Sequence, residues 1–433
     1  MAEKVLILGL SKSGIAAAKL AVSKGYDVYV TEKKNEVNLE QVKELQNLGV
    51  KIEHGSHSEE FISGASFAIT SPGIPPKSEI FRRLNEKNIK IISEVEFAYL
   101  NTKTPFIAIT GTNGKTTTTA LVSHILSKKF SAPVCGNIGV PPTSLIEENH
   151  DFLVCEISSY QAQMTEKFKA KIACWTNFTP DHIDWHGGLE NYFNAKAKIF
   201  LPPQEPEFAI LNAQDTKLKE FSKQCQNVIF FDDGNDCGIK NNSIFYKGEE
   251  IISLKDCPLV GHHNYQNIMC GIIIAKLVGM NNSDIREQIM SFRAPEHRLE
   301  KVREMDGITF FNDSKATNPE ASIVAIDSFN NQNVALILGG RDKNTDLTEM
   351  CHSINKHIKT VLLIGEATER FEENLKKNGF SNIIKEHTME DAIDKAISLK
   401  PDVVLLSPAC ASFDMFKSYE HRGEVFKDYV LSK

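Results

Sequence analysis

The sequence lacks the features that identify several classes of protein. Its nine cysteines are scattered singly, with no Cys-x-x-Cys pair, so we expect buried free thiols rather than disulfides or a cysteine-bound zinc. No apolar run approaches the roughly 20 residues of a transmembrane helix. The first run, Val5–Leu10, is also too short for the core of a signal peptide. We therefore expect a cytoplasmic protein that does not interact with membranes.

An excess of positive charge is also missing. The formal net charge is −7, so no general electrostatic attraction to nucleic acid is expected. Internal repeats and low-complexity segments do not stand out either. What the chain does have is length and apolar content. Its 433 residues, 41% of them hydrophobic, suffice for about three domains of about 150 residues each.

The most informative stretch is Pro105–Thr119. The apolar run 106–109 predicts a buried strand, which is followed by Gly-Thr-Asn-Gly-Lys-Thr at 111–116 and a helix-forming segment. This is the layout of a phosphate-binding loop, in which backbone N–H groups face the phosphates, Lys115 reaches the outer ones and the Thr116 hydroxyl can bind Mg²⁺. The spacing is shorter than usual, because Ile109 stands where a first glycine is expected. The alternative is a strand-to-helix turn that merely contains Lys-Thr.

A second glycine loop, Gly9–Gly14, follows the predicted strand 4–10 and opens a helix. Glu32 ends the next strand, 18 positions after Gly14. The spacing is that of a dinucleotide-binding fingerprint, but Ser11 replaces the glycine that lets a pyrophosphate approach the backbone. We therefore favour another nucleotide over NAD at this helix N-terminus. A further strand ends in the loop 71–75, Ser-Pro-Gly-Ile-Pro, at the kind of sheet edge where open α/β sheets bind ligands.

Polar residues also follow two predicted strands of the middle region. Glu156 ends the strand 152–156, where a carboxylate can hold Mg²⁺ directly or through water; a capping or surface role is the alternative. Two aspartates and two histidines lie within 181–186, after the strand 171–178. Their spacing does not suit tetrahedral zinc, so a histidine near Mg²⁺ or Mn²⁺ is favoured, and either aspartate can instead cap a turn.

Two further segments leave alternatives open. Lys196 lies in an otherwise apolar helix, and the default interpretation is that it extends its amine to solvent. Asn264 and Asn267 precede the apolar helix 268–279 and are expected either to cap it or to contact a nucleotide base, with capping favoured. A linker is expected around 292–298.

The C-terminal third repeats an α/β rhythm, with strands at 308–313, 333–340, 360–365 and 402–409. Polar loops follow three of these strands. We expect Lys315, Lys343, Ser412 and Arg422 to converge at one sheet edge and form a cationic rim for carboxylates or phosphates.

These segments together resemble the Mur ligase family, the ATP-dependent amide-forming ligases of peptidoglycan precursor synthesis. The likeness rests on GTNGKTTT at 111–118, Glu156, NFTPDHIDWH at 177–186, Ala195-Lys196 and GHHNYQN at 261–267. Within the family, NDSKATNP at 312–319, ILGGRDKNTD at 337–346 and the segment 407–426 resemble the members that add D-glutamate. The resemblance extends from Val5 to Phe426, and the shortened glycine loop is the family's own form.

The resemblance implies an α/β fold of three domains. Residues 1–93 would form a Rossmann-like domain that binds the UDP part of the substrate. Residues 94–294 would form a central ATP-binding domain of the P-loop type, and residues 295–433 a Rossmann-like domain that binds the incoming amino acid. A monomer is expected. The small-molecule substrates would be ATP, D-glutamate and UDP-N-acetylmuramoyl-L-alanine, joined through an acyl phosphate, with no nucleic-acid partner.

The resemblance also implies roles for individual residues. The catalytic set would be Lys115, Glu156, His182, Lys196 and Lys343. Two Mg²⁺ ions, for which Mn²⁺ can substitute, would be held by Thr116, Glu156, His182 and a carbamate on Lys196 formed with CO₂. ATP would contact Gly111, Thr112, Asn113, Gly114, Lys115, Thr116, Thr117, Asn264, Asn267, Arg298 and Asp313. The UDP substrate would contact Ser13, Glu32, Ser71, Gly73, Asn137 and His182. D-Glutamate would contact Thr317, Lys343, Ser412 and Tyr419, the last in place of a phenylalanine.

Two alternatives differ in what they predict. A related ligase of the same fold would use a different amino acid or acceptor, and a folylpolyglutamate-type enzyme should lack the N-terminal nucleotide-binding βαβ unit found here. A nucleotide-dependent binding protein or redox sensor would instead bind NAD or fail to turn over ATP.

Overall fold

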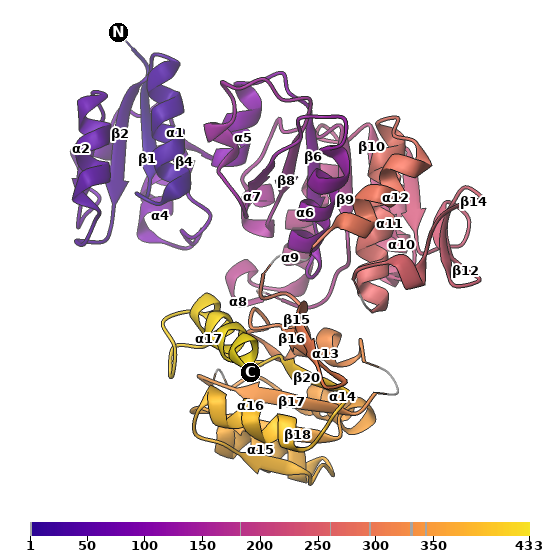
Figure 1. Ribbon diagram of the computed structural model, residues 1–433. Coiled ribbons are helices and arrows are strands. Elements are labelled where there is room, and N and C mark those ends of the chain that lie inside the picture. Colours follow the sequence, from indigo (N-terminus) through magenta and orange to yellow (C-terminus); the bar gives the residue numbers. More distant parts are fainter. Residues whose placement is uncertain (1, 182, 260, 294–295, 330–331, 343) are drawn as a thin grey trace. The chain divides into compact units, whose positions relative to one another are not determined.

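The structure is a computed structural model of the 433-residue chain. It describes all residues except 1, 182, 260, 294–295, 330–331 and 343, and it leaves out the side chain of Asp184 (Figure 1). The chain forms two compact units. One contains residues 1–256 and 266–290, and the other contains residues 257–265 and 291–433. Among the described residues, no helix is both long and apolar enough to cross a membrane.

The N-terminal part of the first unit is a five-stranded parallel sheet of order β3-β2-β1-β4-β5. Its elements are β1 (Lys4–Leu8), α1 (Lys12–Ser23), β2 (Asp27–Glu32), α2 (Leu39–Asn47), β3 (Lys51–His54), α3 (Glu59–Ile62), β4 (Phe67–Thr70), α4 (Glu79–Glu86) and β5 (Lys90–Ser93). Alternate residues of β1 pack against α1 on one face and against α3 and α4 on the other. The strand order reverses beside β1, and this reversal brings the loops after β1 and β4 together.

The rest of the first unit is a nine-stranded sheet of order β14-β13-β12-β11-β10-β9-β6-β8-β7. Its strands are β6 (Phe106–Thr110), β7 (Val134–Gly136), β8 (Leu153–Glu156), β9 (Ile172–Trp175), β10 (Phe208–Asn212), β11 (Val228–Phe231), β12 (Cys237–Lys240), β13 (Ser243–Tyr246) and β14 (Glu249–Ser253). The helices of this part are α5 (Glu94–Leu100), α6 (Lys115–Leu126), α7 (Ser159–Gln163), α8 (Ile183–His186), α9 (Leu189–Ala197), α10 (Thr216–Phe221), α11 (His262–Leu277) and α12 (Asn282–Ser291). β6 lies between β8 and β9, so loops of three strands meet at its carboxyl end.

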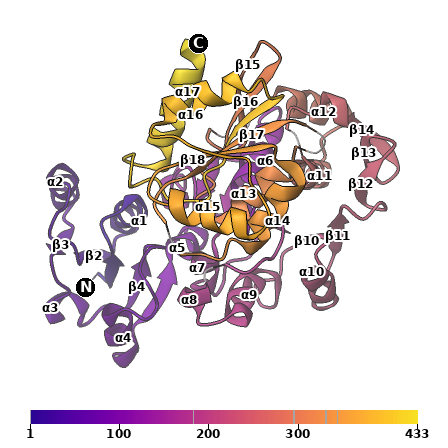
Figure 2. The same ribbon diagram turned by 90° about the horizontal axis from the view of Figure 1, so that it is seen from below.

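The second unit contains a six-stranded sheet of order β15-β16-β20-β17-β18-β19, parallel except for β15. Its elements are β15 (Glu300–Met305), β16 (Ile308–Asn312), α13 (Pro319–Ile326), β17 (Val334–Gly339), α14 (Thr348–His357), β18 (Thr360–Ile364), α15 (Thr368–Lys377), β19 (Ile383–Lys385), α16 (Met389–Ser398), β20 (Val403–Leu406) and α17 (Tyr419–Ser432). Alternate residues of β17 pack against α13, α14 and α15 on one face and belong to the α16 and α17 core on the other (Figure 2).

The α/β fold expected from the sequence is confirmed, and so is the state of the cysteines: all nine are free, and seven are buried. One expectation is wrong. α11 begins at His262, so Asn264 and Asn267 lie inside the helix and cannot cap it at residue 268. The antiparallel hairpins β12–β14 were not predicted.

Two buried carboxylates anchor α5. Glu96 is fully buried and accepts the backbone N–H groups of residues 166, 167 and 168 at 2.8–3.0 Å. Glu94 is 3% exposed and accepts both the N–H and the hydroxyl of Thr143. Burial raises the pKa of Glu94 to about 7, against the opposing effect of these hydrogen bonds. Both glutamates therefore connect α5 to loops of the central sheet.

We predict that stability falls as the pH rises from about 4.5 to 7. In this range the folded protein keeps a proton on Glu94 that the unfolded chain, with a pKa near 4.5, has released. The stabilisation is complete below pH 4.5 and is lost by about pH 7. Relative to Glu94→Gln, the wild type should lose roughly 3 kcal/mol of unfolding free energy over this window, measured by urea unfolding. Exposed Glu79→Gln is the control. Parallel pH profiles of the wild type and Glu94→Gln would contradict the assignment.

Candidate functional site

The loop between β6 and α6 is built so that only glycine fits at two positions. Gly111 has φ +149°, and a Cβ there would lie 1.9 Å from the Thr176 hydroxyl oxygen. Gly114 has φ +80°, and a Cβ there would lie 2.7 Å from Asn267 Oδ1. Ile109, which replaces the first glycine of the longer motif, is a fully buried residue of β6 paired with Glu156. The loop is therefore short because the strand continues to residue 110.

The end of this loop joins a hydroxyl to a buried carboxylate. Thr116 donates from Oγ1 to Glu156 Oε2 at 2.8 Å, and Asn137 donates from Nδ2 to Glu156 Oε1 at 2.8 Å. Glu156 is 2% exposed, so a surface role is wrong. No cluster of three or more His, Cys, Asp or Glu side chains suited to a metal occurs among the described residues. Hard oxygens from one carboxylate and one hydroxyl suit Mg²⁺, which takes its remaining ligands from water and phosphates.

Two lysines meet at one backbone carbonyl of the loop. Lys115 donates from Nζ to the carbonyls of Gly111 at 2.9 Å and Thr112 at 2.7 Å. Lys196, on α9, donates from Nζ to the same Gly111 carbonyl at 2.7 Å and lies 4.8 Å over the Tyr192 ring. Lys196 is 1% exposed, so the expectation that its amine extends to solvent is wrong.

The surroundings of Lys196 disfavour a positive charge. Burial, and next the neighbouring charge of Lys115, hold the pKa of the Lys196 amine well below its ordinary value of 10.5. Asp181 and Glu156 act in the opposite direction. The surroundings thus favour the neutral form of the amine over its charged form, and the neutral form is the one that reacts as a nucleophile.

Several residues that the sequence did not single out brace the loop. The Tyr192 and Thr112 hydroxyls lie 3.1 Å apart. Asn177 accepts the N–H of Asn113 through Oδ1 and donates from Nδ2 to its carbonyl. Of the expected ATP ligands, Asn267 is 4% exposed and accepts from the Thr118 hydroxyl at 3.0 Å. The signals in the sequence were only that Asn177 belongs to the motif 177–186 and that Tyr192 lies four residues before Lys196.

The cluster at 181–186 is described in part. His182 lies outside the described residues. The His186 Nε2 lies 2.9 Å from the Ser159 hydroxyl oxygen, and its ring stacks on Tyr160 at 5.5 Å. The His186 ring therefore packs against the Tyr160 ring.

In the N-terminal sheet, the loops after β1 and β4 meet as expected. The hydroxyl oxygens of Ser11, Ser13 and Ser71 lie within 3.1–3.3 Å of one another. Glu32 accepts the N–H groups of Leu10 and Lys34, at 3.0 Å each. Burial raises the pKa of Glu32, but these hydrogen bonds lower it, and the result is below its ordinary value. An ionised acceptor therefore stands at the position where dinucleotide folds bind a ribose.

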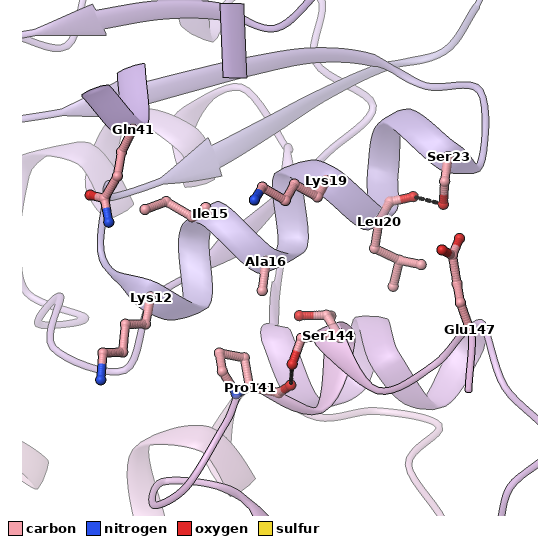
Figure 3. A pocket seen from close by; sticks show the side chains of 11 residues that line it. Lys12, Ile15, Ala16, Lys19, Leu20, Ser23, Gln41, Pro141, Ser144 and Glu147 are labelled. Atoms are coloured by element: carbon pink, nitrogen blue, oxygen red, sulfur yellow. Dashed lines mark hydrogen bonds between the residues drawn. The ribbon is translucent and has the colours of Figure 1, made fainter. Parts of the chain in front are cut away.

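A pocket of about 430 Å³ lies between α1 and the segment 141–147 (Figure 3). Ile15, Ala16 and Leu20 give it an apolar wall, and Lys12 and Lys19 extend from the same helix. None of the residues expected to bind the UDP substrate lines it. The pocket is therefore distinct from the serine cluster of the glycine loop.

In the second unit, the loops after β16, β17 and β20 come together at one sheet edge. The Arg341 N–H donates to the Ala411 carbonyl at 2.8 Å, which joins two of these loops. Ser412 is 1% exposed, and Thr317 is half-buried. Lys315 donates from Nζ to the Tyr419 hydroxyl at 3.0 Å. Lys343 lies outside the described residues.

The prediction of a cationic rim is wrong for Arg422. Arg422 is 1% exposed and donates to the Ser314 hydroxyl and carbonyl and to the Cys410 carbonyl. Burial lowers the pKa of Arg422 to about 10. The guanidinium donates to backbone carbonyls and a hydroxyl inside the domain. It therefore connects the loop after β16 to the loop after β20 and does not face a ligand.

Asp313 also binds within the protein. Its Oδ1 accepts the Leu299 N–H at 3.1 Å, and its Oδ2 accepts from the Ser407 hydroxyl at 2.8 Å. Burial raises the pKa of Asp313 to about 7, against the effect of these hydrogen bonds. The carboxylate fixes the turn 297–299, in which His297 and Leu299 have φ of +63° and +46° on either side of Arg298. Asp313 therefore holds the backbone of the turn that contains Arg298.

Comparisons with known proteins cover nearly the whole chain. The chain matches family models for a Mur ligase MurD-like N-terminal domain at 3–93, a Mur ligase middle domain at 109–275 and a Mur ligase glutamate ligase domain at 297–410. It is 37% identical to the UDP-N-acetylmuramoylalanine--D-glutamate ligase of Caldanaerobacter subterraneus subsp. tengcongensis, covering 99% of this chain and 98% of that protein. It is 36% identical to the ligase of the same name from Bacillus cytotoxicus, covering 98% and 96%.

Solved structures share the fold at lower identity. The UDP-N-acetylmuramate-alanine ligase of Thermotoga maritima aligns with a TM-score of 0.62 at 20% identity, covering 99% of this chain and all of that chain. The Mycobacterium tuberculosis folylpolyglutamate synthase aligns with a TM-score of 0.58 at 16% identity, covering 75% and 92%. The three consecutive domain matches and the full-length relatives lead to one conclusion: the chain belongs to the Mur ligase family.

Proposed function

We propose that this chain is an ATP-dependent ligase that joins D-glutamate to UDP-N-acetylmuramoyl-L-alanine in peptidoglycan precursor synthesis. The observation that carries the proposal is its 36–38% identity, over nearly the whole chain, to ligases named for D-glutamate addition. The loop at 111–116 supports the ATP part, because its glycines, Lys115 and Thr116 form a phosphate cradle at the start of a helix.

The proposed reaction has two steps. The alanyl carboxylate attacks the γ-phosphorus of ATP and forms an acyl phosphate, with ADP as the leaving group. The amine of D-glutamate then attacks the acyl carbon; phosphate leaves, and the amine loses a proton as the amide forms. Both steps bring anions together, so the site has to supply positive charge and alignment. Lys115 would leave the Gly111 and Thr112 carbonyls to bind the outer phosphates.

The oxygens at the end of β8 suit a divalent cation. Thr116 and Glu156 would hold one Mg²⁺, and His182 and a carbamate on Lys196 would hold a second, with Mn²⁺ able to substitute. When bound, these ions would neutralise phosphate charge. The chain's own contribution is to keep Glu156 buried, with Asn137 and Thr116 each donating to one of its oxygens.

Lys196 is suited to carry the carbamate. Its neutral amine would attack the CO₂ carbon and release one proton, which converts a neutral amine into an anionic carbamate. Burial and the charge of Lys115 favour the neutral amine that this step needs. The product would place a negative group beside the Lys115 ammonium, where opposite charges attract.

The remaining residues are assigned by their positions. Ser13, Glu32, Ser71, Gly73 and Asn137 would contact the UDP substrate. Asn264, Asn267, Arg298 and Asp313 would serve the nucleoside and phosphates of ATP. Thr317, Lys343, Ser412 and Tyr419 would contact D-glutamate. We propose domains at 1–93, 94–294 and 295–433, and a monomer that acts in the cytoplasm.

The proposal is tested by phosphate release from ATP in the presence of UDP-N-acetylmuramoyl-L-alanine. D-Glutamate should support release, and L-glutamate, L-alanine, L-lysine and diaminopimelate should not. Release with another amino acid would keep the ligase chemistry and overturn the D-glutamate assignment. No release with any amino acid would favour a nucleotide-binding protein instead.

Lys115→Ala should lower kcat by at least about 10²–10³, because the variant loses one preorganised electrostatic stabiliser of the transferring phosphate. The control is Lys128→Ala, which removes an exposed lysine just beyond α6 and should have near-normal turnover. The readout is kcat for phosphate release. Near-normal turnover by Lys115→Ala would contradict the role given to the loop.

Lys196→Ala should be nearly inactive and should regain part of its activity when short carboxylic acids are added. An added carboxylate can occupy the space of the carbamate, because removing the side chain opens a buried cavity. The same acids should not restore Lys115→Ala. A fully active Lys196→Ala variant would rule out a required carbamate.

A further inference from the structure

Four aromatic side chains form a continuous cluster beside the phosphate loop of the first unit. The Tyr192 hydroxyl oxygen lies 3.1 Å from that of Thr112. The centre of the Tyr192 ring lies 5.4 Å from that of His186, which stacks on Tyr160 at 5.5 Å, and Tyr160 lies 4.3 Å from Trp185. Tyr192 is buried, whereas the other three side chains are half-buried. The cluster therefore starts at the phosphate loop and ends at rings that a ligand can reach.

The elements that carry these rings lie at the carboxyl edge of the central sheet. Tyr160 belongs to α7, which follows β8 and starts with a capping box. Trp185 and His186 belong to α8, which follows β9, and the His186 Nε2 lies 2.9 Å from the Ser159 hydroxyl oxygen. β8 and β9 both pair with β6, the strand that leads into the phosphate loop. Open α/β sheets bind their ligands at this edge.

Trp185 carries a polar group that its surroundings leave unsatisfied. Its Nε1 is buried and has no hydrogen-bond partner in the part of the chain that the structure describes. A buried indole N–H normally finds an acceptor, and leaving it unpaired is costly. Trp175, the other tryptophan, follows this rule, because its Nε1 donates to the Asn177 carbonyl at 3.2 Å. An unpaired donor of this kind is expected where a ligand supplies the acceptor.

The sugar of the proposed substrate has a limited reach from the reacting carboxylate. In UDP-N-acetylmuramoyl-L-alanine, a lactoyl-alanyl arm about two residues long joins the two groups, and it spans at most about 7 Å. The carboxylate has to meet the γ-phosphate of ATP, which the proposed function places beside Lys115. The sugar must therefore lie about one arm length from the phosphate loop. The aromatic cluster extends outward from that loop over the same range.

We propose that Tyr160 and Trp185 form a platform on which the sugar ring of the UDP substrate stacks. A pyranose ring presents an apolar face of C–H groups, and the face of an aromatic ring carries the partial negative charge that attracts them. The indole turns as the sugar arrives, so that its N–H donates to a sugar hydroxyl or to the acetyl carbonyl. The inference rests on the proposed function, because it takes the acceptor substrate to be a UDP-linked sugar.

Tryptophan fluorescence of the full chain tests the platform without relying on turnover. The chain has two tryptophans, and Trp175 is fully buried, so Trp185 is the one that a ligand can reach. UDP-N-acetylmuramoyl-L-alanine should shift the wild-type emission to shorter wavelength in a saturable way, because the sugar replaces water on the indole. UDP alone, at a concentration that calorimetry shows to be saturating, should not shift it. Trp185→Phe should respond to neither compound.

Steady-state kinetics separates the two contributions of Trp185. Trp185→Phe keeps an aromatic face but loses the N–H, so KM for the UDP substrate should rise about threefold to tenfold, as expected for one hydrogen bond. Trp185→Ala loses both contributions, and this KM should rise roughly 10–100-fold. KM for ATP and D-glutamate should stay within about twofold, and kcat should be retained, because only the binding of one substrate is weakened.

Further variants separate binding from folding. Trp185→Phe should unfold within a few degrees of the wild type, because it removes an unpaired buried donor together with some packing. Tyr160→Leu keeps an apolar side chain but removes the ring, and it should also raise KM for the UDP substrate. The control is Leu100→Ala, which removes an exposed apolar side chain of α5 just before the amino end of β6 and should leave every KM unchanged.

Three results would overturn the inference: wild-type emission that does not respond to bound UDP substrate, an equal response to UDP alone, or an unchanged KM for the UDP substrate in Trp185→Ala. Failure of the proposed function would be seen separately, in the wild type. If the UDP substrate bound with the Trp185 response but D-glutamate gave no phosphate release, the proposed function would fail and the platform would stand. If calorimetry detected no binding of the UDP substrate, both would fail.

Discussion

The structure of the catalytic region depends on the convergence of two lysines on one buried carbonyl. Lys115 and Lys196 both donate to the Gly111 carbonyl, at 2.9 and 2.7 Å. Two ammonium groups so close together, one of them fully buried, repel each other and are poorly solvated. Burial and the charge of Lys115 lower the pKa of Lys196, which reduces this repulsion. The Glu156 carboxylate, at the end of β8, is a nearby opposite charge. A site arranged in this way favours anions, such as the phosphates of ATP and the carbamate that we propose on Lys196.

The neighbouring elements keep this arrangement fixed. Thr176, at the end of β9, leaves no room for a side chain at Gly111, and Asn267 of α11 leaves none at Gly114. Asn177 pairs with both backbone groups of Asn113, and Tyr192 contacts Thr112. Three segments far apart in sequence, at 176–177, 192 and 267, thus hold the loop from several sides. Such preorganisation lets electrostatic groups act without a reorganisation cost during the reaction.

Much of this could be predicted from the sequence, because it is encoded locally. Strand, glycine loop, Lys-Thr and helix are consecutive in 105–126. Glu32 and Glu156 end a strand and Ser71 follows one, so the position of each at the carboxyl edge of its sheet follows from parallel topology. The role expected of Lys196 came only from the family resemblance. A lysine in an apolar helix would otherwise be expected to extend its amine to solvent.

Other features could not be predicted, because they depend on long-range packing. The early start of α11 moves Asn264 and Asn267 from a cap into the helix. Arg422 was expected in the cationic rim, but the fold places its guanidinium against Ser314 and Cys410. The hydrogen bonds of Asp313 with Leu299 and Ser407 also join segments that are distant in sequence.

The central proposal is that the buried Lys196 amine reacts with CO₂ to form a carbamate and does not remain a buried ammonium. Carbon-13 NMR of the protein equilibrated with ¹³C-labelled bicarbonate tests it directly. A carbamate resonance should appear in the wild type, persist in Lys198→Ala and be absent from Lys196→Ala. Identical spectra for the wild type and Lys196→Ala would contradict the account and leave Lys196 as a structural cation.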